Sequence, residues 1–420
     1  EEEEPRSGAI ENIYQELLYL ENNPMNLNSV SRDQLERFPL LSLDEINSVM
    51  DFLEKNRPLY TVYELRNVPR LDYRTVALIL PFFQVGETVR VQEDASTLNI
   101  LKTGRHEVQV RFDKTVTPRA GYGEFTDSIL ERYPNRMYRG EDFYNSIRYS
   151  FRYRDKVQMG FTAEKDAGEP FLKAGHPKGY DHYGIHLIVR DMGKLKTVVL
   201  GDYRLSFGQG LVLNNDFVGS KAWSTGNVSR RTGQPKRHFS TAESGFFRGG
   251  TAVTEMGNFS LTAFYSNQRI DANLNDHGEI TSFKVDGLHR TPLEIEKRKN
   301  TREQVTGANI NYREGRFQVG LSTVYHWYDR IHNPTLREYN RYYLRDSVNI
   351  NTGIDYSYQL PGFIFAGETA IAKNGAVATL NMLQYRSSRS LNLSVLHRYY
   401  PVSYNALHAQ AFSEGSRVQN

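Results

Sequence analysis

The sequence predicts an α+β chain, in which an N-terminal all-α module of two helix–hairpin–helix units precedes an antiparallel transmembrane β-barrel. Three observations carry this prediction. Apolar residues recur at helical spacing up to about Phe83. From about Arg105 onward they alternate with polar residues through about fourteen short segments, as in half-buried strands. The connections between those segments are long and short in turn, which is typical of membrane barrels.

The first 23 residues are predicted to form an acidic amphipathic helix. They contain seven Glu and one Arg. Ile13, Leu17 and Leu20 recur at helical spacing, so one side of the segment is apolar.

Residues 24–83 are predicted to form a repetitive helical module, which a linker over 84–104 joins to the strands. Ser31 and Gln34 have the spacing of a capping box, which marks the start of a helix. The stretches QLERFPLLSLDEINSVMDF and ELRNVPRLDYRTVALILPFF each read as a helix, a hairpin led by Pro and a second helix.

Residues 105–420 are predicted to form the barrel, and segment 143–154 shows the strand pattern most clearly. One face of that segment carries Phe143, Ile147, Tyr149, Phe151 and Tyr153, whereas the other carries Tyr144, Ser146, Arg148, Ser150, Arg152 and Arg154. Tight turns are expected near residues 155–156, 191–194, 256–257 and 314–315, with long loops between them. A soluble β-sandwich shows the same alternation within a strand and stays the alternative fold.

Composition agrees with a strand-based membrane protein. The mean hydropathy is −0.59, and the sequence has no apolar run of the ~18 residues that a transmembrane helix needs. The 27 Tyr and 22 Phe would suit the aromatic belts of a barrel. The last strand is expected near 405–412, and the chain then ends in what reads as the start of a loop. We therefore expect further strands to follow in a longer protein.

Two stretches of the module resemble a known family. MNLNSVSRDQLERFP and YTVYELRNVP are similar to the tandem helix-hairpin-helix module of ComEA-type competence proteins. In that family a Gly-hydrophobic-Gly hairpin lets backbone amides reach a DNA phosphate. The corresponding hairpin tips here, which are candidates for a DNA or partner contact, are Leu40, Leu41, Ser42, Arg70, Leu71, Asp72 and Arg74.

The hairpin tips and the charge of the module disfavour nucleic acid as a partner. Both glycine pairs of the family are replaced, and Asp72 would oppose a phosphate. Residues 24–83 hold seven Lys or Arg against eight Asp or Glu, although DNA binding favours a basic surface. With the binding chemistry lost, Leu40, Leu41 and Leu71 would be exposed candidates for a protein contact, or would pack on the first helix or the barrel rim.

The segment LGDYRLSFGQGLVL, at 200–213, resembles a recurring segment of Bacteroidota envelope proteins with a degenerate helix-hairpin-helix region before an outer-membrane barrel. The resemblance implies a bacterial outer-membrane location, a periplasmic helical module, and contacts with outer-membrane lipid and other envelope proteins. We expect a non-enzymatic channel or a subunit of an envelope transport or assembly complex. A DNA-uptake component is the main alternative, and an outer-membrane enzyme the third.

The sequence shows no catalytic signature, and we expect neither a cofactor nor a metal. Gly208-Gln209-Gly210 lacks the third glycine of a dinucleotide fingerprint and is predicted to form a bend or bulge in a long strand. His182 and His186 lie on one face of a predicted strand, where a solvated pair in the lumen is favoured over metal ligation.

Basic residues gather at three places. Two long loops carry Arg230, Arg231, Lys236 and Arg237, and Lys297, Arg298 and Lys299. These loops are expected to face solvent or lipid headgroups, with an anionic ligand as the alternative. Arg148, Arg152 and Arg154 are expected to face the lumen, where they would line an anion-selective pore or belong to a closed polar core.

Overall fold

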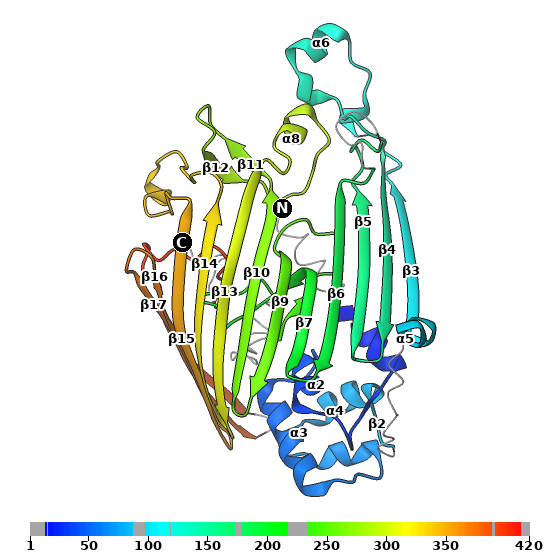
Figure 1. The fold of residues 1–420 in the computed structure, drawn as a ribbon, viewed down its shortest axis with the longest axis vertical. Helices are drawn as coiled ribbons and strands as arrows, with labels where there is room; N and C mark the ends of the chain where they lie inside the picture. The colour runs from blue at the N-terminus through cyan, green and yellow to red at the C-terminus, as the bar shows by residue number, and fades with distance from the viewer. Residues whose placement is uncertain are drawn as a thin grey trace.

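The computed structural model describes residues 13–14, 16–86, 97–117, 119–172, 179–216, 234–388 and 391–412. Short helices lie at one end of a large, strongly curved antiparallel sheet (Figure 1). The loops that carry α6 (Asp127–Arg132) and α8 (Pro292–Glu296) lie at the opposite end. No helix in these ranges is both long enough and apolar enough to cross a bilayer.

Side-chain caps set the starts of the helices in the N-terminal module. Ser31, Ser42 and Thr61 each begin a capping box, and Asp72 caps the next helix by accepting from the Thr75 amide. The helices are α2 (Arg32–Arg37), α3 (Leu43–Asn56), η1 (Val62–Asn67), α4 (Tyr73–Ile79) and η2 (Leu80–Phe82).

The module has an apolar core of its own. Leu35, Ile46, Leu53 and Leu65 are fully buried between its helices. A short parallel pair, β1 (Met25–Asn26) with β2 (Phe83–Gln84), brings its two ends together. The relation to the ComEA-type family stays a prediction.

The sheet has 14 strands. Successive strands are antiparallel neighbours, and β8 (Lys236–Arg237) lies beside β7. The remaining strands are β3 (Arg105–Lys114), β4 (Phe143–Tyr153), β5 (Val157–Lys165), β6 (His182–Met192), β7 (Leu195–Arg204), β9 (Phe247–Met256), β10 (Phe259–Ile270), β13 (Thr301–Glu314), β14 (Phe317–Tyr328), β15 (Val348–Leu360), β16 (Phe363–Ala372), β17 (Val377–Ser388) and β18 (Leu391–Tyr399).

A few short elements complete the described chain. A helix, α5 (Thr97–Thr103), lies within the predicted linker and leads directly into β3. A separate hairpin of β11 (Ala272–Leu274) and β12 (Ile280–Phe283) stands on the long connection after β10. The 3-10 turns η3 (Ala120–Tyr122), η4 (Pro134–Arg136) and η5 (Glu338–Asn340) lie in other long connections.

The two faces of the sheet differ in chemistry. Along β14 the side chains of Phe317, Leu321 and Tyr325 are exposed on the convex face, whereas those of Ser322 and His326 are buried on the other face. The same alternation leaves further large apolar side chains exposed on other strands: Ile185, Leu200, Tyr265, Ile310, Ile354 and Phe365. The predicted alternation is thus present, with its apolar side outward.

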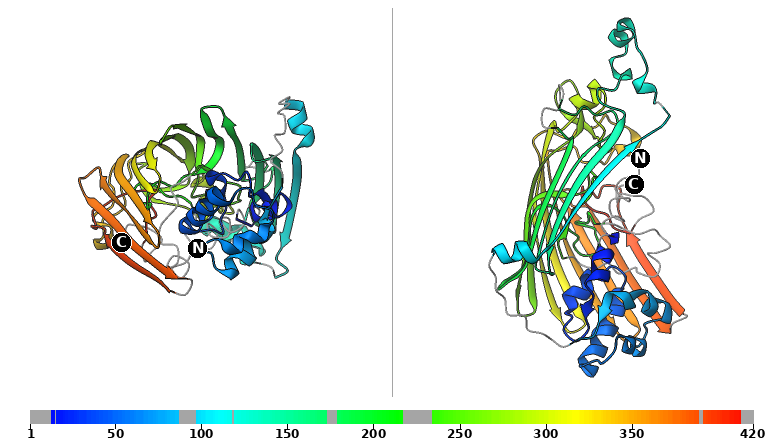
Figure 2. Two further views of the ribbon diagram at one scale, coloured as in Figure 1. Left: turned by 90° about the horizontal axis from the view of Figure 1, so that it is seen from below. Right: turned by 90° about the vertical axis from the view of Figure 1, so that its right-hand side faces the viewer.

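The sheet forms an open arch of the predicted number of strands, consistent with a β-barrel but not closed. β3 and β18 are its two ends, and no pairing joins them in the described ranges. Viewed from the end that carries the helices, the N-terminal module lies across the opening of the arch (Figure 2). An even number of strands does not close a sheet by itself, because closure also depends on strand tilt and stagger.

The predicted last strand is wrong. Residues 405–412 form turns instead and lie on the concave side, where Ala406, Ala409 and Ala411 are buried. The predicted alternation of long and short connections also fails after β16. A short turn, 373–376, joins β16 to β17 where the alternation predicts a long loop.

Candidate functional site

Glu16 links the N-terminal helix to the concave face of the sheet. Its Oε2 lies 2.9 Å from Nη2 of Arg152 on β4 and 3.8 Å from Nη2 of Arg237 on β8. Burial by itself raises the pKa of Glu16, but the charges of the two arginines outweigh burial and hold the pKa at about 2. This ionised contact is referred to below as the Glu16 latch.

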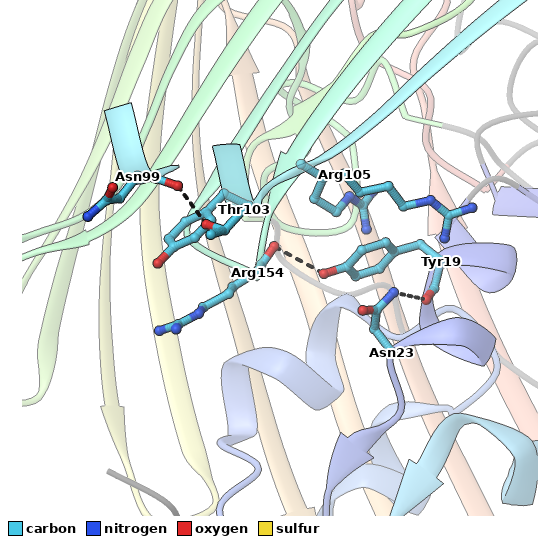
Figure 3. A pocket seen from close by; sticks show the side chains of 8 residues that line it. Tyr19, Asn23, Asn99, Thr103, Arg105 and Arg154 are labelled. Carbon is cyan, nitrogen blue, oxygen red and sulfur yellow. Dashed lines mark hydrogen bonds between the residues drawn. The ribbon is translucent and has the colours of Figure 1, made fainter. Parts of the chain in front are cut away.

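A cavity of ≈440 Å³ lies beside the Glu16 latch. Tyr19 forms part of its wall: the hydroxyl donates to the backbone oxygen of Arg154 at 3.1 Å (Figure 3). The guanidinium carbon of Arg152 lies 3.7 Å from the centre of the Tyr19 ring, within cation–π range. The other lining residues are Asn23, Asn99, Thr103, Arg105 and Tyr153. Three of the lining residues are arginines, and one of them, Arg152, is already paired with Glu16.

Ion pairs fasten the module to the short turns of the sheet. Arg37 pairs with Asp155 in the turn between β4 and β5. On the turn between β13 and β14, Arg316 lies 2.7 Å from Asp51, and Arg313 just before it lies 3.0 Å from Glu36. The module therefore lies at the short-turn end of the sheet.

Segment 205–213 leaves the sheet after β7 and fills the concave side. Glu368 of β16 holds it by accepting three backbone N–H groups, from Gln209 at 2.6 Å, Leu211 at 3.0 Å and Val212 at 3.2 Å. Gly208 allows the turn, since its φ is +52° and an added Cβ would lie 2.8 Å from the Glu368 carboxylate. The glycine pair therefore serves an inward turn, and the predicted bend within a long strand is wrong.

Segment 404–411 covers segment 205–213 from the inside. The Tyr404 hydroxyl donates to the Leu211 carbonyl at 2.8 Å, and the Gln410 amide donates to the Gly210 carbonyl at 3.0 Å. Both segments contribute fully buried side chains to one apolar core. They are referred to below as the internal plug, because they occupy the space that the strands enclose.

The hairpin tips of the module are not an exposed apolar surface. Leu41 and Leu71 are both 1% exposed and belong to the module core. Leu40 is partly buried against the same core. Ser42 and Asp72 use their side chains to cap α3 and α4. The predicted exposure of the leucines is wrong, because the turn points inward.

The arginines of the hairpin tips lie near the surface. Arg70 is half-buried with φ +67°, and Arg74 is exposed.

The basic loops do not form free cationic patches where the structure describes them. Arg298 and Lys299 both contact Asp181: Nε of Arg298 lies 3.1 Å from its carboxylate, and Nζ of Lys299 donates to its carbonyl at 3.0 Å. Lys297 is half-buried. The expectation of exposed basic loops is therefore wrong for this loop.

In the other basic loop, Lys236 pairs with Asp216 and Arg237 belongs to the Glu16 latch. Arg230 and Arg231 lie outside the described residues.

Two of the three predicted lumen arginines lie on the concave side. Arg152 belongs to the Glu16 latch, and Arg148 lies over the Phe239 ring at 5.8 Å. Arg154 is in the turn after β4 and is exposed, so its predicted inward position is wrong.

His182 and His186 share the inner face of β6 as expected. They are 3% and 1% exposed, so the expected solvation is wrong.

Sequence reasoning missed the buried carboxylate and histidine clusters. His289 is fully buried between Asp181 at 2.8 Å and Asp271 at 2.5 Å, and its backbone amide donates to Glu169 at 2.8 Å. A second cluster joins Glu303, His326 and His408. Strand alternation places Glu303 and His326 on the inner face, but no sequence signal brings in His408 from a turn.

No protein-family model matches this chain, and no curated protein matches it. Solved outer-membrane proteins are among the structures to which this chain is similar. The FrpB iron transporter of Neisseria meningitidis is 14% identical with a TM-score of 0.29, over 61% of this chain and 42% of that one. OmpF of Salmonella typhi is 14% identical with a TM-score of 0.27, over 71% and 89%. A loop-deletion variant of OmpT, an outer membrane protein of Vibrio cholerae, is 11% identical with a TM-score of 0.27, over 70% and 93%. This chain thus spans less than half of the FrpB transporter, and similarity at this level carries no functional argument.

Proposed function

We propose that this chain is a non-enzymatic bacterial outer-membrane β-barrel component with a periplasmic helical module, acting as a gated channel or as a subunit of an envelope transport complex. The observation that carries the proposal is that the sheet is apolar on its outer, convex face and polar on its inner, concave face. Large apolar side chains cover the convex face, whereas Glu303, Asp355 and Glu368 are buried on the concave one. Lipid stabilises an apolar outer face, whereas a soluble sandwich would bury it.

The concave side supports a closed resting state. The internal plug fills the space beside β16, and the module lies across the short-turn end, held by the Glu16 latch (Figure 2). The Glu16 side chain is still 30% exposed, so the latch can open without disturbing the strands. A channel built in this way conducts only after the latch or the plug moves.

DNA uptake has no structural observation in its favour. A DNA-binding hairpin presents backbone amides to a phosphate, whereas Ser42 and Asp72 use their side chains to cap helices here. Leu41 and Leu71 pack inward. The acidic balance of the module also opposes counterion-driven binding.

Conductance of the full chain in planar lipid bilayers tests the proposal. We expect insertion with little conductance for the unaltered protein, and several-fold higher conductance for Glu16→Gln, because the amide cannot hold the two arginines by charge. Glu21→Gln is the matched control, since Glu21 is exposed on the same helical segment. Failure to insert would refute the membrane assignment. Insertion without conductance in all variants would refute the channel and leave the subunit role.

A further inference from the structure

Glu303, His326 and His408 converge from three separate parts of the fold. Glu303 is near the start of β13, and His326 is near the end of β14, diagonally across the pair on the same inner face. His408 comes from the internal plug. The Glu303 Oε1 atom lies 2.9 Å from Nε2 of His326 and 3.0 Å from Nε2 of His408. All three candidate ligand atoms lie within 4.8 Å of one another.

The surroundings hold the two imidazole rings in place. The centre of the His326 ring lies 4.3 Å from that of Tyr328, and the His408 ring lies 5.1 Å from Phe247. The second oxygen of Glu303 accepts from Gln268 at 2.7 Å. Both rings therefore direct Nε2 at one carboxylate oxygen from fixed positions.

Charge distinguishes this cluster from the one around His289. Near His289, the Arg298 guanidinium already pairs with the Asp181 carboxylate, and the Lys299 ammonium lies at the Asp181 carbonyl. Glu303 is buried with an exposed fraction of 3%, and in the described part of the chain it forms ion pairs with His326 and His408. A buried carboxylate without a permanent cation is stabilised by a metal ion that binds between it and two neutral imidazoles.

The donor set suits zinc. Two His nitrogens with one carboxylate oxygen form a common three-ligand zinc site, which leaves a fourth position open. Tetrahedral bonds of about 2.0–2.1 Å separate neighbouring ligand atoms by roughly 3.3 Å. The observed separations of 2.9 and 3.0 Å are only a few tenths of an ångström shorter.

We propose that Glu303, His326 and His408 bind one zinc ion, which fastens the internal plug to β13 and β14. This assignment departs from the expectation of no metal site, because no spacing in the sequence links His408 to the two strands. It does not rest on the proposed transport role, since metal content is measured without reference to permeability.

Zinc binding by the full chain in detergent tests the proposal. Tag-free protein is stripped with a chelator and titrated with Zn²⁺, and the bound metal is counted by mass spectrometry. Co²⁺ replaces Zn²⁺ in a parallel titration, because its visible spectrum reports tetrahedral coordination by nitrogen and oxygen. The chain has no Cys, so thiolate binding cannot contribute.

We expect one tightly bound zinc and a tetrahedral Co²⁺ spectrum for the unaltered protein. His408→Asn is expected to weaken zinc by more than the ~10–100-fold that losing a supporting group around a metal costs. His277→Asn is the matched control, because His277 is exposed in a loop. Glu303→Gln provides a second variant that keeps the size of the side chain. Absence of stoichiometric zinc in the unaltered protein, or equal affinity in folded His408→Asn protein, would overturn the assignment.

Discussion

At the scale of single residues, buried carboxylates organise the irregular parts of this chain. Glu368 accepts three amides of segment 205–213. Asp181 and Asp271 enclose His289 at the end of the sheet opposite the N-terminal module. A loop has no strand partners for its backbone groups, so a single acceptor on a neighbouring strand can decide its path.

Glu368→Gln is expected to loosen the internal plug. The variant replaces one accepting carboxylate oxygen by an NH2 group, which cannot accept from a backbone amide, and each hydrogen bond contributes ~0.5–1.5 kcal/mol. Hydrogen exchange should therefore accelerate at the amides of Gln209, Leu211 and Val212. Glu296→Gln, at an exposed position, serves as the control. Unchanged exchange would mean that apolar packing alone holds the segment.

The cluster around His289 is expected to weaken at alkaline pH. Burial lowers the pKa of His289, but its hydrogen bonds to Asp181 and Asp271 outweigh burial and raise it to about 9. The stabilisation is therefore complete below about pH 6.5, the pKa of a free histidine, and is lost as pH rises through about 9. Burial also raises the pKa of Glu169 to about 8. Its ionisation as pH rises through that value therefore also lowers the stability of the folded protein.

Thermal unfolding between pH 6 and 10 measures this effect. His289→Gln should flatten the pH dependence in that window, whereas exposed His277→Gln should leave it unchanged. A stability that rises with pH through this range would contradict the assignment of a charged His289.

At the scale of elements, the period of two in the strands sorts side chains between two environments. Leu321 is 46% exposed on the convex face of β14. Gln318, on the concave face, accepts from Arg313 at 3.0 Å. A carboxylate introduced at position 321 would therefore face lipid, whereas the same group at position 318 would face the Arg313 guanidinium.

Leu321→Glu is expected to impair insertion, and Gln318→Glu to be tolerated. A carboxylate on the lipid face costs less than the ~2–4 kcal/mol of Arg or Lys at the bilayer midplane, but still destabilises. Arg313 would pair with the carboxylate at position 318. The folded fraction in lipid vesicles measures both effects, and equal losses would indicate that the convex face is not in lipid.

At the scale of the whole molecule, the module and the long loops lie at opposite ends of the sheet (Figure 1). In the proposed outer-membrane orientation, the module faces the periplasm. The exposed side chains of Tyr60 in the module and Leu336 in the loop after β14 report on the two ends. The absence of Cys in the sequence makes both positions addressable by thiol reagents.

Labelling of intact cells is expected to modify Leu336→Cys and to spare Tyr60→Cys. The bilayer separates the two ends, and an impermeant reagent reaches only the outer one. Permeabilising the outer membrane should then expose Tyr60→Cys, which controls for its intrinsic reactivity. Labelling of Tyr60→Cys alone on intact cells would reverse the orientation.

Local pattern alone determined the two kinds of architecture in this chain. Ser31 with Gln34 marks a helix start that the structure contains, and the alternation along 143–154 marks a strand. These features depend on neighbours within a few residues, so periodicity and capping chemistry report them directly. The turn between β13 and β14 followed from the same kind of signal.

Only the tertiary structure decided what fills the arch and whether it closes. Segments 205–213 and 404–411 turn inward because Glu368 and Tyr404 lie where distant strands bring them, and sequence spacing does not encode that meeting. The Glu16 latch and the convergence of His408 on Glu303 likewise join residues more than one hundred positions apart. Closure depends on tilt and stagger summed over many strands, which no local pattern contains.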